Sequence, residues 1–508
     1  MSEQLKGKKI IIFQQRGWAK NVGYYLAEGL KKEGCKLAAL TLKKSSHRII
    51  SEQKSAEYEY VINIDDIFDD PYKYLGDEEI SLEEICKELN IDSVWPMIYS
   101  NRLFSRSYGE KFYYGYKQNV SDEFIAAYLK AYYKVIRNLF NNFKPDAIFT
   151  AAFIYEGHTI LNFFADKFNI PIVSITDSRV PGYYVFTGDY LDRKGPLLDR
   201  FSEINKGKKS ENLAKSKEFI KEFRERFKRP EYAVNQNEKI SLIKKIRAEL
   251  APYRRILGWY LKRNSSENYI KSVGPTIDYK SPKIILRDHY YQKKYKNFAK
   301  NFKYYPLDKI NKFVFYPLQF TPEGSADLRS PLYNNQLELA RQIAMSLPGD
   351  YTLVVKEHPA MVGLRSPSYY EKISRTLNVK LVDYRISSEE IIKKSGLVIS
   401  SYGTVLFESA FFYKPAIILS DAKIFTLLPN VFKHTDISSL SQKMKELLKI
   451  NLKNDKYEKQ LENYISAVFD VGFTADYRKA WYQGEANSRE RLIDLFIGEI
   501  NRRINEKN

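Results

Sequence analysis

The sequence predicts an α/β protein built from two doubly wound, Rossmann-like domains that face each other across a cleft. Alternating strand and helix patterns run through residues 8–176, and a second such series runs through residues 313–419. The stretch between them is basic and has few strand patterns, so we expect two separate sheets. At 508 residues the chain is also long enough for two or more hydrophobic cores.

These patterns divide the chain into four parts. We expect a first Rossmann-like domain over residues 1–204 and a basic, mainly helical insertion over residues 205–310. The second Rossmann-like domain is expected over residues 311–455. Residues 456–508 are then helices that pack back toward the first domain.

The first domain is expected to open with strand, helix and strand at residues 8–13, 19–33 and 36–42, where Gly34 ends the helix. No Gly-x-Gly-x-x-Gly follows the first strand, so a dinucleotide site is not expected. Further strands are expected at 57–64, 146–151 and 172–176, acidic loops up to residue 84, and helices at 121–143 and 159–168. The loops after the last two strands would carry Glu156 and Asp177.

In the second series, strands are expected at residues 313–318, 351–355, 379–383, 397–400 and 416–419. Helices are expected at residues 335–346, 368–377, 388–395, 404–412 and 438–450, with tail helices at 457–468 and 489–505. Residues 244–263 mix basic and apolar side chains, which suits either a helix on an anionic bilayer or an ordinary helix packed on the body. Pro252 and Gly258 are expected to weaken one long helix there.

The amino-acid composition and the net charge limit the kinds of molecule that the protein is expected to bind. Hydrophobic residues make up 44% of the chain and aromatic residues 15%, as in a globular protein. The net charge of +20 favours nucleic acid, an anionic membrane or an anionic small molecule, or else reflects a solvated lysine-rich surface. Because the basic residues are spread out and no nucleic-acid-binding module is present, nucleic acid is not an expected partner.

Cysteine usage and hydropathy indicate a cytoplasmic protein. Cys35 and Cys86 provide neither a disulfide framework nor a metal-binding pattern. The apolar run at residues 10–13 is too short for a signal peptide, and no apolar stretch approaches the ~20 residues of a membrane span. We therefore expect a cytoplasmic protein, either free or peripheral on the inner face of the membrane.

Residues 353–359 form a buried-strand pattern that ends on polar residues. Ligands of open α/β sheets bind at the carboxyl ends of strands, where Lys356, His358 and Pro359 are expected. His358 is expected to donate to a leaving phosphate, as a cation or as a general acid; the alternative is a capping or structural histidine. Lys356 and Arg365 would add positive charge there, or would lie on the surface.

Residues 397–410 form a strand pattern, a tight turn and the start of a helix. The residues expected at a bound phosphate are Ser400, Ser401, Gly403 and Thr404. Glu408, one turn into the helix, would accept from a ribose hydroxyl or would face solvent. No Walker lysine and no His-Glu-x-x-His are present, which disfavours an ATPase and a zinc hydrolase.

These runs resemble the capsular polysaccharide biosynthesis family, which includes the bacterial Kdo (3-deoxy-manno-octulosonate) transferases. The resemblance is carried by residues 316–319, 322–323, 355–359, 363–365 and 401–410. The His-Pro and Ser-Ser pairs are also similar to those of bacterial sialyl- and polysialyltransferases, which use CMP-sugars. Glu156 and Gly157 resemble the acidic-acidic-glycine motif that carries their catalytic base, with Tyr155 in place of the first acid.

The resemblance implies a GT-B fold and a glycosyltransferase, with the donor nucleotide on the second domain and the acceptor on the first. The sugar would be Kdo- or sialic-acid-like, and the acceptor a surface or capsular glycan, free or lipid-linked. His358, Ser400 and Ser401 would stabilise the departing phosphate, and Glu156, or else Asp177, would deprotonate the acceptor. No cofactor and no metal is expected, because a CMP leaving group carries one phosphate.

Three other functions remain open at this point. One is a hydrolysing nucleotide-sugar 2-epimerase, which would convert a nucleotide-sugar without any acceptor. Another is a polyol-phosphate transferase. The third is a non-catalytic, membrane-associated scaffold of an envelope assembly complex, which would bind anionic vesicles and no nucleotide.

Overall fold

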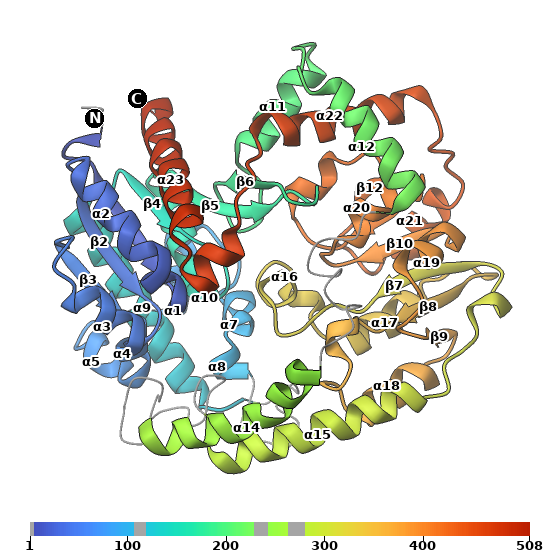
Figure 1. Ribbon diagram of the computed structural model, residues 1–508, viewed down its shortest axis with the longest axis horizontal. Helices are drawn as coiled ribbons and strands as arrows, with labels where there is room; N and C mark the ends of the chain where they lie inside the picture. Colours follow the sequence, from blue (N-terminus) through green and yellow to red (C-terminus); the bar gives the residue numbers. More distant parts are fainter. Residues whose placement is uncertain (1–4, 106–117, 228–241, 263–279, 508) are drawn as a thin grey trace.

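A computed structural model describes residues 5–105, 118–227, 242–262 and 280–507 (Figure 1). It contains two six-stranded sheets. Five strands of each sheet come from one predicted series, and the sixth, at residues 184–187 or 431–433, was not expected. The predicted fold class, two doubly wound, Rossmann-like α/β domains, is therefore confirmed. None of the described helices is long and apolar enough to cross a membrane.

The first sheet has the strand order β3-β2-β1-β4-β5-β6. Its strands are β1 (Lys9–Gln14), β2 (Lys36–Thr41), β3 (Tyr60–Asn63), β4 (Ala147–Thr150), β5 (Ile172–Asp177) and β6 (Tyr184–Thr187). All neighbours are parallel except β5 and β6, which pair antiparallel. The strand order reverses between β1 and β4, and such a switch point is where open α/β sheets bind ligands.

The second sheet is parallel throughout, in the order β12-β11-β10-β7-β8-β9. Its strands are β7 (Phe313–Pro317), β8 (Thr352–Lys356), β9 (Val379–Val382), β10 (Leu397–Ser400), β11 (Ala416–Ile418) and β12 (Val431–Lys433). The apolar residues of β7, β8 and β10 are buried on both faces, as their β-branched and aromatic composition predicts. The switch point lies between β7 and β10.

Helices cover both faces of each sheet (Figure 1). Those up to β6 are α1 (Arg16–Trp18), the π-helix η2 (Ala19–Gly23), α2 (Tyr24–Lys32), α3 (Lys44–Glu52), α4 (Ile64–Asp69), α5 (Pro71–Leu75), α6 (Leu82–Leu89), α7 (Trp95–Ser100), α8 (Arg102–Ser105), α9 (Asp122–Phe143) and α10 (Glu156–Lys167). Along the chain, β6 is followed by α11 (Pro196–Asn205), α12 (Leu213–Arg226), α14 (Leu242–Lys262), α15 (Pro282–Asn301) and η4 (Leu307–Lys309), and then by the second sheet.

The second sheet is accompanied by α16 (Gly324–Asp327), η5 (Pro331–Tyr333), α17 (Gln336–Met345), η6 (Pro359–Met361), α18 (Pro367–Arg375), α19 (Ser388–Lys394), α20 (Val405–Ala410), η7 (Lys423–Leu427) and α21 (Leu440–Leu447). The chain ends with α22 (Asp455–Val471), η8 (Lys479–Gln483) and α23 (Ala486–Lys507). Helix α22 packs on α11 and α12, whereas α23 packs on α2, β4 and β5 and buries Leu492 and Phe496 against the first sheet.

Three expectations about local structure are wrong. Residues 65–84 were expected to be acidic loops, but they contain α4, α5 and the start of α6. Residues 153–158 were expected to be loop, yet α10 begins at Glu156, whose carboxyl suits a helix N-terminus. Pro252 does not break α14, although an interior proline removes one helical hydrogen bond.

A buried polar network joins the two domains. The Asp192 carboxylate accepts from the Tyr402 hydroxyl at 3.1 Å and lies 3.6 Å from the Arg329 guanidinium. Arg329 also donates to the Tyr190 carbonyl at 2.9 Å, and Arg179 donates to the Tyr402 hydroxyl at 2.9 Å. Tyr402 and Arg329 follow strands of the second sheet, Arg179 follows β5, and Tyr190 and Asp192 follow β6. This network therefore holds the two sheets in one arrangement.

Replacing Asp192 with asparagine is expected to lower the free energy of unfolding by about 3–5 kcal/mol, because it leaves the buried Arg329 cation without its carboxylate. Asparagine keeps the size of the side chain and tolerates the positive φ of 54° at this position. Thermal or urea unfolding measures the effect. The control is Asp421→Asn, whose carboxylate pairs with Lys433 at an exposed site and should contribute about 0–1 kcal/mol.

Candidate functional site

The switch point of the second sheet is bridged by one glutamine. Gln319, which follows β7, donates from Nε2 to the Ser400 hydroxyl at 3.3 Å and to the Tyr402 carbonyl. The Arg365 guanidinium donates to the Gln319 carbonyl at 2.7 Å and lies 3.5 Å from the Glu357 carboxylate. Thus the ends of β7, β8 and β10 form one hydrogen-bonded network.

Three buried atoms in and beside this network have no hydrogen-bond partner among the described residues, two of them in the network and one on Ser401, the residue after Ser400. They are Gln319 Oε1, Arg365 Nη1 and Ser401 Oγ. Their side chains are at least nine-tenths buried. Buried polar atoms are normally paired, so the unpartnered acceptor of Gln319, cationic donor of Arg365 and hydroxyl of Ser401 at the ends of these strands point to water or a polar ligand.

His358 lies at the end of β8, beside this network. Its Nδ1 accepts from the Ala360 backbone N–H at 3.2 Å. Burial, with Arg365 and Lys356 nearby, lowers the pKa of His358 to about 4. The ring is therefore neutral at pH 7, and because Nδ1 is an acceptor, the ring proton sits on Nε2. His358 can donate from Nε2 as a neutral imidazole, which replaces the expected cation in the ligand-free protein.

The other residues predicted for the phosphate lie on the same edge of the sheet. Lys356 is buried and donates to the Ser388 hydroxyl at 3.1 Å, so a surface role is excluded. Glu408 is only 8% exposed and does not face solvent. A Cβ added at Gly403 would lie 3.1 Å from the Ser400 hydroxyl, which explains a small residue in this turn.

The structure also decides the positions of three further predicted residues, Thr404, Pro359 and Arg365. Thr404 precedes α20, which is six residues long and not the expected helix at residues 404–412, so the case for a phosphate rests on side chains. Pro359 is exposed and opens the short turn η6. Arg365 is buried in the network, so the alternative of a surface arginine is wrong.

Glu156 is fully buried at the start of α10. Its Oε1 accepts from the Asn101 amide at 2.7 Å and from the Tyr128 hydroxyl at 3.1 Å, while Oε2 has no partner in the described chain. Burial raises the pKa of Glu156 to about 8, so the carboxyl is mostly protonated at pH 7. Glu156 lies in α10 and not in the expected exit loop, and its assignment as the base stays a prediction.

Asp177 ends β5 and is half-exposed. Its carboxylate accepts from the Arg179 backbone N–H at 2.7 Å and lies 3.8 Å from the Arg179 guanidinium. The same guanidinium reaches Tyr402 of the second domain. Asp177 is thus the accessible carboxylate of the two, and it lies next to the interdomain network.

The switch point of the first sheet is bridged in the same manner as that of the second. Gln15, which follows β1, donates to the Ala152 carbonyl at 2.7 Å and lies 2.8 Å from His158 Nε2. The His158 ring stacks on Phe13 at 4.0 Å, and burial lowers the pKa of His158 to about 3. Gln15 and His158 were not predicted as site residues, and Gln319 was noted only among residues 316–319, which carry the family resemblance. Gln15 directly follows β1, and Gln319 comes two residues after the end of β7.

The exit loops of the two sheets touch each other. A Cβ added at Gly324 would lie 3.0 Å from the Phe153 carbonyl, and Arg102 Nε lies 3.3 Å from the Asp327 carboxylate. The loop after β4, which leads to Glu156, therefore lies against the loop after β7. Within the described residues, no group of three or more His, Cys, Asp or Glu side chains could hold a metal ion.

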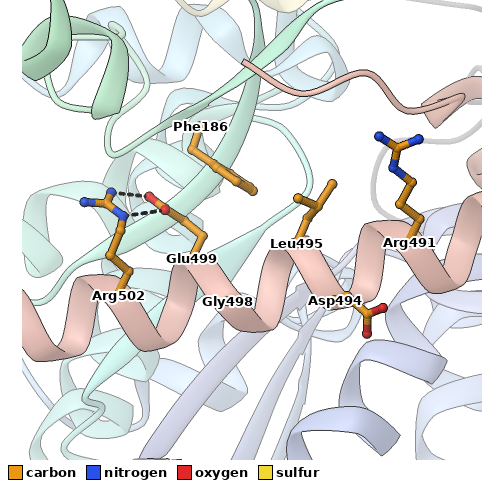
Figure 2. Close-up of a pocket in the computed structure, with 7 residues that line it drawn as sticks. All are labelled: Phe186, Arg491, Asp494, Leu495, Gly498, Glu499 and Arg502. Carbon is orange, nitrogen blue, oxygen red and sulfur yellow. Dashed lines mark hydrogen bonds and ion pairs between the residues drawn. The ribbon is translucent and has the colours of Figure 1, made fainter. Parts of the chain in front are cut away.

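A surface pocket of about 450 Å³ lies elsewhere, between β6 and α23 (Figure 2). It is lined by Phe186, Arg491, Asp494, Leu495, Gly498, Glu499 and Arg502. Its two closest opposite charges, Arg502 and Glu499, pair with each other at 2.6 Å. None of the residues that line this pocket follows a strand at either switch point, so we do not assign the candidate functional site to this pocket.

Comparisons with known proteins find distant structural likeness. No protein-family model and no curated protein sequence matches the chain. A beta-Kdo 2,7-transferase, KpsC of Thermosulfurimonas dismutans, is 14% identical, with a TM-score of 0.36 over 80% of this chain and 96% of that one. The UDP-GlcNAc 2-epimerase of Methanocaldococcus jannaschii is 12% identical, with a TM-score of 0.24 over 91% and 98%. Because both scores are below 0.5, the proposals below rest on this chain's own residues.

Proposed function

We propose that the chain is a glycosyltransferase that uses a nucleotide-sugar donor. The observation that carries the proposal is the pair of unpartnered buried atoms in the network of Gln319 and Arg365, with the unpartnered hydroxyl of Ser401 directly after β10. Arg365, Lys356 and the Nε2–H of His358 give this place the donors and positive charge that suit a phosphate. The first candidate donor is a CMP-sugar whose sugar is Kdo- or sialic-acid-like, and the acceptor is a surface or capsular glycan.

In the proposed reaction, the bond between the anomeric carbon and the donor phosphate breaks, and an acceptor oxygen forms the new bond to that carbon. His358, with Ser400 and Ser401, would stabilise the negative charge that develops on the leaving phosphate. A carboxylate would take the proton from the acceptor hydroxyl. Glu156 is the proposed base and Asp177 the second candidate, because both follow strands of the first sheet.

A thermal-shift panel tests the proposal with CMP, CDP, UDP, GDP and their sugars. One nucleotide is expected to raise the melting temperature, because a ligand at about 100 times its Kd adds ~2.7 kcal/mol to the free energy of unfolding. Ser401→Ala, which removes the unpartnered hydroxyl and adds no atom to the buried site, is expected to reduce that shift. A panel in which no nucleotide or nucleotide-sugar changes the melting temperature would contradict the proposal.

Product analysis separates this function from the alternatives. With an active donor and a glycan acceptor, a transferase releases the nucleotide and forms a new glycosidic bond. Conversion of the nucleotide-sugar without any acceptor would instead identify an epimerase. Transfer of a phosphorylated polyol, with the phosphate retained on the product, would identify a polyol-phosphate transferase.

A further inference from the structure

Helix α14 carries an apolar stripe that is exposed to solvent. Ile246, Leu250, Tyr253, Leu257 and Leu261 recur at spacings of four and three residues, which places them on one face of the helix. Their exposed fractions are 52%, 51%, 59%, 62% and 79%. In a folded domain such a stripe normally faces the core, so a contiguous exposed one indicates an interaction surface.

A different side of α14 makes the contact with α15. Pro252 of α14 is buried. The Glu249 carboxylate pairs with Lys293 of α15 and lies 3.6 Å from the His289 ring. Since Glu249 and Pro252 are outside the apolar stripe on the helical wheel, packing between the two helices leaves the stripe uncovered.

The chemistry beside the stripe is basic. Helices α14 and α15 each contain six basic residues and one acidic residue, a net charge of +5 each. Together they carry +10, which is half of the chain's net charge of +20. Arg247 and Arg254 each directly follow a residue of the stripe and are exposed. An apolar face with arginines at its edge is complementary to an anionic lipid surface, where acyl chains meet phosphate headgroups.

The helix pair is fixed to the second domain next to the candidate site. Helix α15 packs on α18, and Gly363 of the preceding loop sits so close to α15 that an added Cβ would lie 3.0 Å from the Gln292 carbonyl. Gly363 has a φ of 91°, which glycine adopts without strain. Its loop connects His358 to Arg365. In Figure 1, α14 and α15 run along the lower edge of the molecule, below α8 and beside α18.

We propose that α14 docks the protein onto an anionic lipid bilayer, with its apolar stripe at the level of the acyl chains and the arginines at the headgroups. Because α15 packs on α14, on α18 and against Gly363, the attachment also fixes the position of the loop between His358 and Arg365 relative to the membrane. The docked protein then holds its second switch point close to the membrane surface. Docking depends on the exposed apolar stripe and on the basic charge of α14 and α15, whether or not the chain transfers a sugar.

Vesicle sedimentation of the full chain tests the proposal. The chain is expected to sediment with vesicles of equal parts phosphatidylcholine and phosphatidylglycerol, and not with pure phosphatidylcholine. Leu250→Glu/Leu257→Glu is expected to lower the partition coefficient at least about tenfold. Arg247→Glu/Arg254→Glu is expected to lower it about fivefold or more for each charge removed, with a weaker dependence on salt. A chain that stays in the supernatant at low salt overturns the proposal.

Leu332→Glu/Leu377→Glu is the matched control. These leucines are 78% and 89% exposed and lie outside α14 and α15, so this variant should bind vesicles like the parent. All three variants change exposed side chains and should keep the parent's melting temperature. The alternative is that the apolar stripe binds a second copy of the chain, and sedimentation equilibrium measures this self-association. If the stripe variant only converts a dimer to a monomer and leaves vesicle binding intact, α14 is a self-association surface and the proposal is wrong.

Discussion

Replacing His358 with alanine is expected to lower the turnover number by ~10²–10³, with donor binding reduced much less. The neutral ring donates from Nε2, and this hydrogen bond matters most when charge accumulates on the leaving phosphate. Because the pKa of His358 is about 4, the pH profile of the ligand-free protein should show no titration of this ring between pH 6 and 8. Initial rates and a nucleotide titration measure the two effects.

His434→Ala is the control for this experiment. His434 follows β12, at the same edge of the same sheet, and its Nε2 lies 3.2 Å from the Ser439 hydroxyl, away from the network of Gln319 and Arg365. It should keep the parent's turnover. His358→Gln retains an N–H donor and should recover part of the lost rate. Parental turnover in His358→Ala would refute the assignment and leave His358 as a cap of the turn η6.

Replacing Glu156 with glutamine is expected to have two separable effects. The first is on stability. Since the folded-state pKa of Glu156 is raised from 4.5 to about 8, its contribution to stability is complete below pH 4.5 and is lost as the pH rises toward 8. The loss at pH 7 is about 3 kcal/mol, because each pH unit above the ordinary pKa costs ~1.4 kcal/mol. The variant should therefore melt higher than the parent at pH 8 and not at pH 4.

The second effect of Glu156→Gln is on transfer. If Glu156 is the base, the parent's rate should rise with pH through about 8, and the variant should bind donor normally while transferring slowly. Asp177→Asn should retain more activity. The reverse order, with Glu156→Gln as fast as the parent and Asp177→Asn slow, would assign the base to Asp177. Glu156 would then be a buried acid that only joins α10 to Asn101 and Tyr128.

The sequence by itself determined the two-sheet architecture and the position of the main candidate residues. The buried strands β8 (Thr352–Lys356) and β10 (Leu397–Ser400) lie within one residue of their expected bounds, because continuous β-branched runs are a local signal. His358 and Ser401 therefore reach the strand ends where they were expected. The helices after β3 were missed, although Ser81 and Glu84 form a capping box that marks the start of α6.

Only the tertiary structure decided which of these residues are charged and which are accessible. Glu156 is mostly protonated at pH 7 because burial among residues distant in the chain raises its pKa, although the hydrogen bonds from Tyr128 and Asn101 oppose this rise. His358 is neutral because burial and the nearby Arg365 oppose its protonation. In the sequence, the apolar residues of α14 were compatible with a buried helix and with an exposed one. In the structure α15 contacts another side of α14, so the apolar stripe stays exposed. Desolvation, pKa and exposure depend on neighbours that are far apart in sequence, so no local pattern contains them.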